Sequence, residues 1–166
     1  MERDKAVTGV ALAKDQAKVV IRDVPDRPGI AAQIFSALGK NKINVDMIVQ
    51  ATQKDGTNSI TFTVNEDDLQ STLTVAKDVG KELGAPKIEH DAKVCKISIV
   101  GVGMISQPGV AAQMFQTLAD AGINIELIST SEIKVSCVIR DEHGAKAVQL
   151  LHKVFELDAA PVAKLV

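Results

Sequence analysis

The chain has 166 residues, of which 46% are hydrophobic and 24% charged, and its 19 basic and 21 acidic side chains give a formal net charge of -2. This composition is typical of a globular protein with one ordinary core or two small ones. The lack of a basic surplus argues against nucleic acid or an anionic membrane as a partner. The chain also has no Trp or Tyr and only four Phe, so it lacks the stacking surfaces of single-stranded RNA readers.

Two observations bear on the compartment. No apolar stretch approaches the roughly 20 residues that a membrane-spanning helix needs, and Met1 to Lys5 lack the apolar core of a secretory signal. We therefore expect a cytoplasmic protein with no membrane partner. Cys95 and Cys137 lie in apolar runs without a CxxC partner or a nearby His, so we expect small buried hydrophobes and not ligands or nucleophiles.

The predicted elements begin with a strand over Ala6–Ala13, which has no obvious partner in the segment directly after it. The β-branched run Lys18–Val24 predicts a second strand, and a turn with Pro28 at the expected first helical position leads into a helix. Four apolar residues form one stripe of that helix: Ile30, Ile34, Phe35 and Leu38. Two strands, a helix and a last strand are then predicted over Ile43–Gln50, Asn58–Val64 after an Asp55-Gly56 hairpin signal, Glu66–Leu83, and Lys87–Asp91.

The same order of elements then repeats. Shifted by 80 positions, residues 28–48 align without gaps with residues 108–128, and ten of these 21 positions are identical. Shared composition alone would give about one or two identities, so the chain contains a duplication. The second copy predicts strands over Lys96–Val102, Ile123–Thr130 and Ile133–Ile139, a helical stripe of Val110, Met114, Phe115 and Leu118, and a helix over Asp141–Phe155.

Each copy therefore has the ferredoxin-like order βαββαβ of the α+β class, with an antiparallel four-stranded sheet and both helices on one face. The tail Asp158–Val166 makes a poor final strand, so we hypothesise that Ala6–Ala13 completes the second sheet. The first domain is then 17–93, inserted into a second domain made of 1–16 and 94–166. Open sheets of this kind commonly associate, so we expect pairing between the copies and between two chains.

Catalytic and metal-binding signatures are missing from the sequence. We find no phosphate-binding GxxxxGK loop, no GxSxG elbow and no HExxH, and His90, His143 and His152 have no ligand spacing. Gly101-Val102-Gly103 follows a strand as in a dinucleotide-binding loop, but Ser106 occupies the third glycine position, so we interpret it as a strand-end loop. We expect neither catalytic residues nor a metal site in this chain.

The loop before each first helix is the candidate ligand site. The first helical turn has backbone N–H groups without partners inside the helix, and the helix dipole favours an anion, so this turn can hold a carboxylate. Gly29 and Ala31 allow a ligand to approach the main chain. Asp26, Asp46 and Gln50 could accept hydrogen bonds from an ammonium group. Taken alone, one such loop is equally compatible with Asp26 serving only as a helix cap.

The duplication adds to this interpretation. Asn44 and Asn124 stand where the second strands are predicted to begin and could bond a ligand's backbone-like groups. Ser106 and Gln107 replace the charged pair of the first loop, so the two loops keep their shape but differ in charge. This would suit one ligand held between unlike copies. We therefore predict a non-catalytic regulatory module that senses a free amino acid.

Several segments resemble the regulatory region of aspartokinases, over nearly the whole chain. The run Ser129–Val135, which follows Gly122–Ile128, is similar to a signature of that region, as are Val7–Ala11, Asp26–Gly29 and Asp46–Gln50. The resemblance implies that both copies are ACT domains and that the kinase domain is missing, so ATP and Mg would belong to that domain and this chain needs no cofactor. It also implies lysine, threonine or both as effectors that inhibit aspartate-family amino acid synthesis.

The resemblance further implies a homodimer in which the effector lies between the first ACT domain of one chain and the second of its partner. The residues implied are Asp26, Arg27, Pro28, Gly29, Ile30, Ala31, Asn44, Val45, Asp46 and Gln50 on one side and Val110, Ala111, Asn124, Ile125, Ser131 and Glu132 on the other. Effector binding would shift the dimer between arrangements that an aspartokinase catalytic chain or domain senses. Ile30 and Gln107 occupy positions that vary among relatives, so the choice between lysine and threonine stays open.

Two other functions remain open from the sequence. One is a free-standing ACT-domain regulator that senses an amino acid, for example in transcription. The other is a small enzyme of ferredoxin-like fold. A separately made β subunit and an excised regulatory segment are both compatible with Met1 as the first residue.

Overall fold

The computed structural model describes residues 5–157, so the expectation for the tail, 158–166, lies outside the described residues. Contacts divide the chain into two compact units. We call Asp15–Lys93 the inserted unit, and the described residues up to Lys14 together with those from Val94 onward the enclosing unit. The inserted unit holds the first copy of the repeat and the enclosing unit holds the second. The domain boundary drawn from the sequence falls two residues later, at residue 17.

Two long strands supply residues to both units. β1 (Gly9–Val24) belongs to the enclosing unit up to Lys14, and β4 (Ile88–Val100) belongs to the inserted unit up to Lys93. The sequence predicts separate shorter strands here, because polar and charged residues interrupt the apolar runs. The structure instead continues each strand and places one residue with positive φ at each boundary, Asp15 (φ 56°) and Lys93 (φ 62°). Neither residue is a glycine, so the sequence gives no signal for these irregularities.

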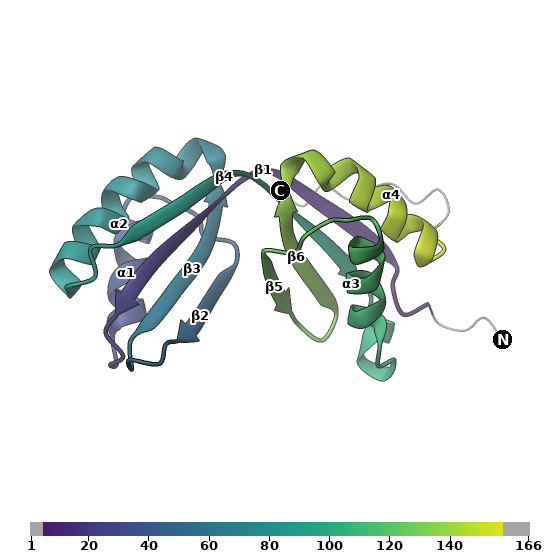
Figure 1. The fold of residues 1–166 in the computed structure, drawn as a ribbon, viewed down its shortest axis with the longest axis horizontal. Helices are drawn as coiled ribbons and strands as arrows, with labels where there is room; N and C mark the ends of the chain where they lie inside the picture. Colours follow the sequence, from purple (N-terminus) through teal and green to yellow (C-terminus); the bar gives the residue numbers. More distant parts are fainter. Residues whose placement is uncertain (1–4, 158–166) are drawn as a thin grey trace. The chain divides into compact units, whose positions relative to one another are not determined.

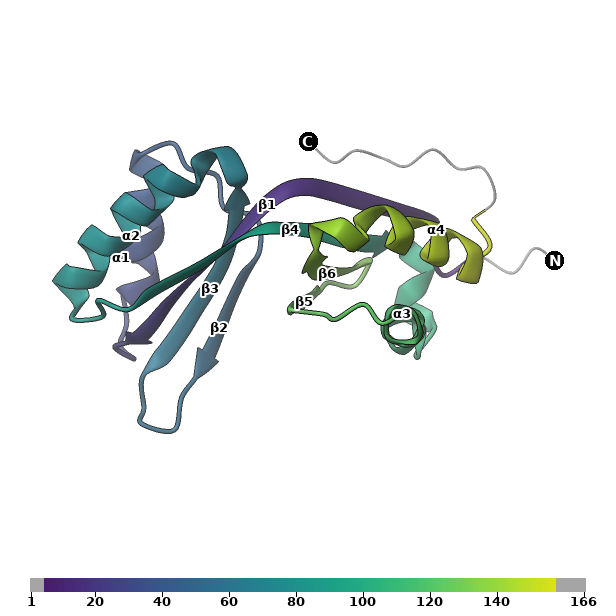
Figure 2. The same cartoon turned by 45° about the horizontal axis from the view of Figure 1, so that its top comes forward.

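The inserted unit is an antiparallel sheet covered on one face by two helices, as predicted (Figure 1). Its strand order is β2-β3-β1-β4. Its other elements are α1 (Ile30–Lys40), β2 (Ile48–Thr52), β3 (Asn58–Asn65), the short 3-10 helix η1 (Glu66–Asp68) and α2 (Leu69–Leu83). The helices α1 and α2 lie on the same side of these strands in both views (Figures 1 and 2).

The predicted stripe of α1 forms part of the core of this unit. Ile34 and Leu38 are each 1% exposed, and the Phe35 ring packs edge-on against Phe62 of β3 with 5.6 Å between ring centroids. Burying an aliphatic side chain of this size contributes about 1.5–3 kcal/mol. The helix therefore holds its first turn, which follows the candidate ligand loop, in a fixed position over the sheet.

The enclosing unit has the same architecture, with strand order β1-β4-β6-β5. Its other elements are the 3-10 helix η2 (Val102–Ser106), α3 (Val110–Asp120), β5 (Leu127–Thr130), β6 (Lys134–Arg140), the 3-10 helix η3 (Asp141–His143) and α4 (Gly144–Val154). The N-H of Thr8 donates to the carbonyl of Val100 at 2.8 Å, so the N-terminal segment runs beside the second half of β4. Two ferredoxin-like units of the α+β class therefore make up the described chain.

Both cysteines are buried in the core of the enclosing unit, as predicted. Burial raises the pKa of the Cys95 and Cys137 thiols to about 12, so neither is a thiolate near neutral pH. The start of α4 approaches the sheet closely, because a Cβ on Gly144 would lie 3.1 Å from the Cys95 sulfur. Among the described residues, no helix is long and apolar enough to cross a membrane.

The second strand of each copy begins later than the sequence predicts. β2 begins at Ile48 and β5 at Leu127, because the preceding residues make only isolated ladder contacts. One such contact is the N–H of Asp46 donating to Thr63, and the other is the N–H of Glu126 donating to Val138. These two hydrogen bonds place Asp46 and Glu126 at the same end of their respective units.

Candidate functional site

The loop between β1 and α1 begins at a β-bulge. Ile21 lies opposite Ile60 in the ladder with β3, but the next registered pair is Val24 opposite Asn58, so β1 contains one extra residue. Within the bulge, Asp23 has a φ of 56°. The bulge ends the regular pairing and brings the loop that follows to the Asn58 end of β3.

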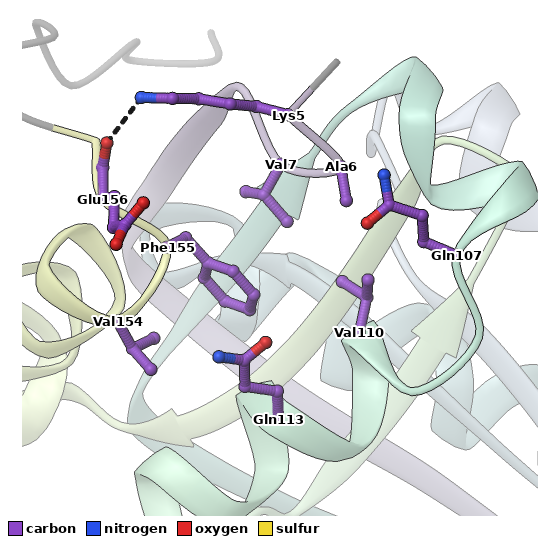
Figure 3. A pocket seen from close by; sticks show the side chains of 9 residues that line it. All are labelled: Lys5, Ala6, Val7, Gln107, Val110, Gln113, Val154, Phe155 and Glu156. Carbon is purple, nitrogen blue, oxygen red and sulfur yellow. Dashed lines mark hydrogen bonds between the residues drawn. The ribbon is translucent and has the colours of Figure 1, made fainter. Parts of the chain in front are cut away.

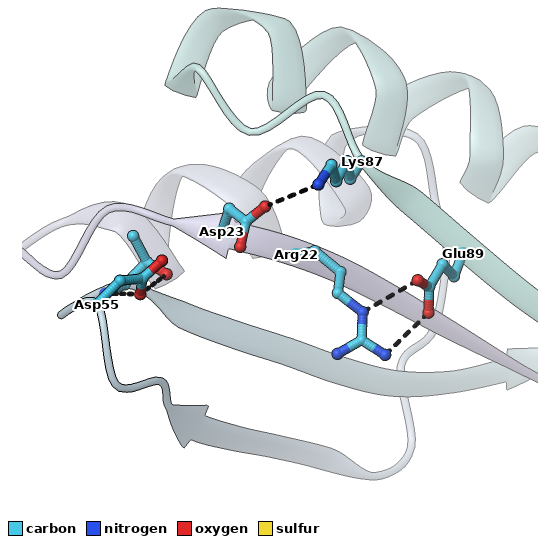
Figure 4. A network of polar contacts seen from close by, with 6 residues as sticks. Arg22, Asp23, Asp55, Lys87 and Glu89 are labelled. Atoms are coloured by element: carbon cyan, nitrogen blue, oxygen red, sulfur yellow. Dashed lines mark hydrogen bonds and ion pairs between the residues drawn. The ribbon is translucent and has the colours of Figure 1, made fainter.

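Ion pairs join the bulge to the start of β4 (Figure 4). The Arg22 guanidinium donates two hydrogen bonds to the Glu89 carboxylate, at 3.1 and 2.9 Å, and Lys87 lies 3.6 Å from a carboxylate oxygen of Asp23. The Arg22 contact lowers the pKa of Glu89, and the Glu89 contact raises the pKa of Arg22. Because these side chains are about half exposed, the pairs contribute little to stability and serve mainly to orient the two strand ends.

The helix after the loop starts later than predicted. Gly29, and not a residue before Pro28, is the N-cap, so Pro28 is not at the first helical position. Gly29 has a φ of 92°, a left-handed conformation that proline cannot adopt and that favours glycine. The first intrahelical bond runs from the N–H of Gln33 to the carbonyl of Gly29 at 3.0 Å. The N–H groups of residues 30–32 therefore precede the helical ladder and can receive a carboxylate.

Asp26 does not cap this helix, since the α1 N-terminus has no side-chain cap hydrogen bond. Its carboxylate instead accepts a hydrogen bond of 3.0 Å from the side-chain amide of Asn58. Asn58 is only 3% exposed, and its amide oxygen is buried without a hydrogen-bond partner among the described residues. A carboxylate and a buried acceptor that lacks a donor therefore lie side by side, which is the arrangement that an ammonium group satisfies.

A second unpaired polar group lies at the same end of the sheet. Thr52 is opposite Asn58, and the next residue, Gln53, closes the hairpin by donating its N–H to Thr57 at 2.7 Å. The side-chain nitrogen of Gln53 is buried and has no partner within the described part of the chain. Sequence reasoning missed both Asn58 and Gln53. For Asn58, the available signal was an amide at the first position of a strand in which polar and apolar residues alternate.

The prediction that one unit gathers Asp26 and Asp46 around an ammonium group is wrong. The main chain of Asp46 bonds to Thr63, whereas Asp26 bonds to Asn58, and five residues of an extended strand separate these two positions by about 17 Å. Asn44 and Val45 precede Asp46 on the chain and lie toward the same far end. The sheet explains this separation, because β2 starts at the end opposite to the loop that follows β1.

The other predicted residues of the first copy lie near the Asn58 end. Gln50 is exposed and pairs with Ile60, two positions along β3 from Asn58. Ile30 is 5% exposed and part of the core, so it can offer a ligand only its main chain. The remaining predicted residues of this loop and turn are all exposed: Asp26, Arg27, Pro28, Gly29 and Ala31.

The predicted residues of the second copy also fall into two groups. Val110 and Ala111 form the first turn of α3, which follows Gly109 in the left-handed conformation (φ 93°). The turn with Ser131 and Glu132 is at the same end, because the carbonyl of the next residue accepts the N–H of Gly101 at 2.9 Å. Asn124 and Ile125 precede the Glu126 contact with Val138 and therefore lie at the opposite end of β6, about 13 Å away.

The second copy lacks the polar groups of the first. Ile128 lies opposite Cys137, just as Ile48 lies opposite Phe62, and this register places Ile133, an apolar residue, at the position of Asn58. Ile133 is 44% exposed, whereas Asn58 is buried. Because Ser106 also replaces Asp26 in the sequence repeat, the pairing of a carboxylate with a buried amide has no counterpart in the described part of the enclosing unit.

Family models agree with the duplication. Models described as ACT domain match residues 19–82 and residues 97–155, one in each copy. Both copies are therefore ACT domains. These two matches cover most of both units and leave no part of the described chain for a separate kinase fold.

Relatives extend this result to most of the chain. An aspartate kinase of Pseudomonas fluorescens is 47% identical over 153 residues, which are 92% of this chain and 37% of that protein. The regulatory subunit of aspartate kinase from Thermus thermophilus, solved in a ligand-free form, is 42% identical with a TM-score of 0.83 over 91% of this chain and 99% of that one. A chain in a structure of aspartokinase alpha and beta subunits is 48% identical, also with a TM-score of 0.83, and is 99% covered.

The chain belongs to the family of aspartokinase regulatory subunits. It spans 37% to 40% of the length of the curated relatives that it matches, and it contains ACT domains without a kinase domain among the residues described.

Proposed function

We propose that this chain senses threonine, lysine or both for an aspartokinase, and that effector binding at the inserted unit restrains the kinase activity of an associated catalytic chain. That activity would be transfer of a phosphoryl group from ATP to the aspartate carboxylate, and the ATP and Mg would belong to the catalytic chain. The observation that carries the proposal is the buried amide oxygen of Asn58, unpaired and beside the Asp26 carboxylate.

The geometry supports a free amino acid as the ligand class. The ammonium group would receive acceptors from Asp26 and Asn58, and the carboxylate would receive the N–H groups at the start of α1. The αL conformation of Gly29 directs the chain into that helix with no side chain over the first turn. Because both charged ends of a free amino acid are used, a residue within a peptide chain would fit this site poorly.

Edge strands support dimer formation. β2 and β5 are the outer strands of their units, and each carries a large exposed apolar side chain at the same position of the repeat: Ile48, 51% exposed, and Ile128, 46% exposed. Exposed apolar residues on an unpaired strand edge are typical of a strand that pairs with another chain. We propose that β2 of one chain pairs with β5 of a second chain and that these residues become buried.

Antiparallel pairing of these edges would also reunite the two groups of site residues. The Asp26 end of the inserted unit would then face the Asn124 end of the partner's enclosing unit, and the Asn44–Asp46 end would face Val110 and Ser131. This arrangement explains why the family's effector residues lie at both ends of each sheet. It also predicts one full amino acid site per chain, since the ammonium-binding groups occur only at the Asp26 end.

Regulation then follows from linkage. An effector that bridges two chains stabilises the dimer arrangement in which both halves of the site meet, and it can shift the equilibrium only through a higher affinity for that arrangement. An associated catalytic chain would respond to that shift. A free-standing regulator would bind the same ligands but would have no such chain to restrain.

Calorimetric titrations with threonine and lysine, alone and together, test the proposal. We expect saturable binding with one site per chain for at least one of them, and at least a tenfold loss of affinity in Asp26→Ala and Gln50→Ala at nearly unchanged melting temperature. An assay of aspartate phosphorylation with a catalytic chain present should show inhibition by the same ligand. If neither amino acid binds, the assignment is wrong. Binding without restraint of any catalytic chain would favour the free-standing regulator.

A further inference from the structure

A ligand-sized pocket lies in the enclosing unit, on the side of its sheet that the helices cover (Figure 3). Its volume is about 650 Å³, within the usual range for small-molecule sites. The first turns of α3, the end of α4 and the segment that leads into β1 form its walls. The residues that line it are Lys5, Ala6, Val7, Gln107, Val110, Gln113, Val154, Phe155 and Glu156.

The exchange of strands between the units accounts for the pocket. In the inserted unit, α2 continues directly into β4 through residues 84–87, and Ala85 is fully buried beneath this turn. In the enclosing unit, the strand that takes the same place is β1, which comes from the N-terminal side of the chain and has no covalent link to α4. Among residues 5–157, a gap therefore remains where the first copy has a turn. The ammonium of Lys5 partly bridges the gap by donating to the carbonyl of Glu156 at 2.7 Å.

The equivalent region of the inserted unit is closed. There α2 has 15 residues, against 11 in α4, although both helices follow a three-residue 3-10 turn. Gln33, the counterpart of Gln113, donates to Glu82 in this longer helix at 3.2 Å. Gly80 has room for no side chain, because a Cβ there would lie 2.5 Å from the carbonyl oxygen of Ala85. In the described residues, these contacts occupy the place in the first copy that the pocket takes in the second.

The chemistry of the lining defines a ligand class. Val7, Val110, Val154 and Phe155 project toward the middle of the pocket and give it an apolar floor (Figure 3). The rim carries one cation, one carboxylate and two carboxamides, and the ammonium of Lys5 has two protons besides the one that binds Glu156. A dicarboxylate would be repelled by Glu156 and a diamine by Lys5. A zwitterion with a hydrocarbon side chain meets all of these groups favourably.

Glu156 occupies an unusual backbone position. It follows α4 with a φ of 54°, and its N–H and that of the next residue return to Lys153 and His152 at 3.2 and 2.8 Å. The first copy makes the same helix cap with Gly84, at a φ of 71°. A glycine would be less strained at this position than a glutamate. The enclosing unit therefore places a carboxylate on the pocket rim at a position where the fold favours no side chain.

We propose that this pocket binds a second amino acid effector, an α-amino acid with an apolar side chain. Lys5 would bind the ligand carboxylate and Glu156 its ammonium group. The ligand side chain would pack on the apolar floor that includes Val7 and Phe155. The inference rests on the proposed function only in that the chain senses amino acids. The pocket belongs to one unit of one chain, so it does not require the dimer, and Val110 is the one lining residue that it shares with the residues implied for the effector site.

Leucine is the probe for a calorimetric titration of the purified chain. We expect saturable leucine binding, and at least tenfold weaker binding of 4-methylpentanoate and of isoamylamine, which each lack one of the two charges. In carbon–proton NMR spectra, the methyl signals of Val7 and Val154 should shift on titration. The absence of saturable heat and of methyl shifts would overturn the proposal. It would also be overturned if the two singly charged analogues bound as tightly as leucine.

Variants separate a ligand site from a structural gap. Gln113→Phe should fill the pocket and lower leucine affinity at least tenfold, while Gln33→Phe, its counterpart in the first copy, should leave it unchanged. Glu156→Gly should leave the melting temperature unchanged or raise it and still weaken leucine binding about tenfold. Equal leucine affinity of wild type and Gln113→Phe would overturn the assignment. Asp26→Ala should keep leucine binding while losing threonine or lysine binding, so the two proposals can fail independently.

Discussion

Replacing Asn58 with Val is the sharpest test of the effector site, because the protein already carries an apolar β-branched residue, Ile133, at the same position of its second copy. The substitution removes the hydrogen bond of 3.0 Å to the Asp26 carboxylate, which contributes about 1.5–3 kcal/mol as a bond to a charged group. It also removes a buried amide oxygen without a partner, which costs the wild type about 1–3 kcal/mol. The exposed Asp26 carboxylate can return to water.

These terms nearly cancel, so the free energy of unfolding should change by less than about 1 kcal/mol, or roughly 4–8 °C in melting temperature for a unit of this size. The effector, in contrast, loses an acceptor for its ammonium group. We expect threonine or lysine affinity to fall about 10- to 100-fold, which corresponds to about 1.4–2.8 kcal/mol. Calorimetric titration gives the affinity, and differential scanning calorimetry gives the stability.

Val135→Asn, at the buried position that corresponds to Ile60, is a control in the second copy. It introduces a buried amide with no carboxylate beside it, since Ser106 stands where the first copy has Asp26. It should cost about 1–3 kcal/mol of stability and leave effector affinity unchanged. Our reasoning is refuted if Asn58→Val destabilises the protein by more than about 3 kcal/mol, which would mean that its amide oxygen has a partner, or if effector affinity is unchanged.

Three smaller predictions concern stability. Gly29→Ala and Gly109→Ala should each cost about 1 kcal/mol in thermal unfolding, because both glycines have φ near 90°, but only Gly29→Ala should weaken effector binding. Burial raises the pKa of Cys95 and Cys137 from 9.0 to about 12, so the unfolded chain loses these protons first and stability should fall as the pH rises from 9 toward 12. Urea unfolding at pH 8 and pH 10 should show a loss of about 1.4 kcal/mol per cysteine at most, and less in Cys137→Ala. Arg22→Ala should cost under about 1 kcal/mol in the same assay, with a smaller effect in high salt.

Helical periodicity and the repeat predicted most of the fold, because both depend only on the order of residue types along the chain. The stripe of Ile34 and Leu38 is buried as expected, and the helices predicted after β3 and β6 are present, each opening with a 3-10 turn. The length of β1 and β4 could not be predicted, since Asp15 and Lys93 have a positive φ that only the surrounding structure imposes. Proline preferences placed the helix start at Pro28, but the left-handed Gly29 delays it.

The candidate site shows a different limit. Residue types in the loop after β1 correctly suggested a place for charged ligand groups, but one sequence cannot show which end of a sheet a residue occupies until the register is known. Asp46 therefore seemed close to Asp26, although Thr63 and Asn58 hold them apart. Asn58 was missed because an amide within a strand usually has its partners in the sheet. Its unpaired oxygen is visible only when the neighbours are placed.

Gly101→Ala tests the role of the N-terminal segment in the enclosing unit. The φ of Gly101 is 174°, which any residue adopts, so conformational strain plays no part. A Cβ at this position, however, would overlap the carbonyl oxygen of Ala6 and lie 2.9 Å from the Val7 Cα. The segment must move away, and it then loses the burial of Val7, 2% exposed, and the bond from Thr8 to Val100. Together these changes should cost about 2–4 kcal/mol.

Hydrogen exchange locates that loss. Amides of residues 7–14 and of α4 should exchange faster in Gly101→Ala, while those of α1 should keep their protection, because the inserted unit has its own core. Gly39→Ala is the control, since a Cβ there meets nothing within 4 Å and a helix interior favours alanine by about 0.5–1 kcal/mol. If Gly101→Ala is as stable as wild type, the segment does not complete the second sheet in solution. In that case the wild-type segment and α4 would not enclose a defined pocket, and the wild-type protein should not bind leucine.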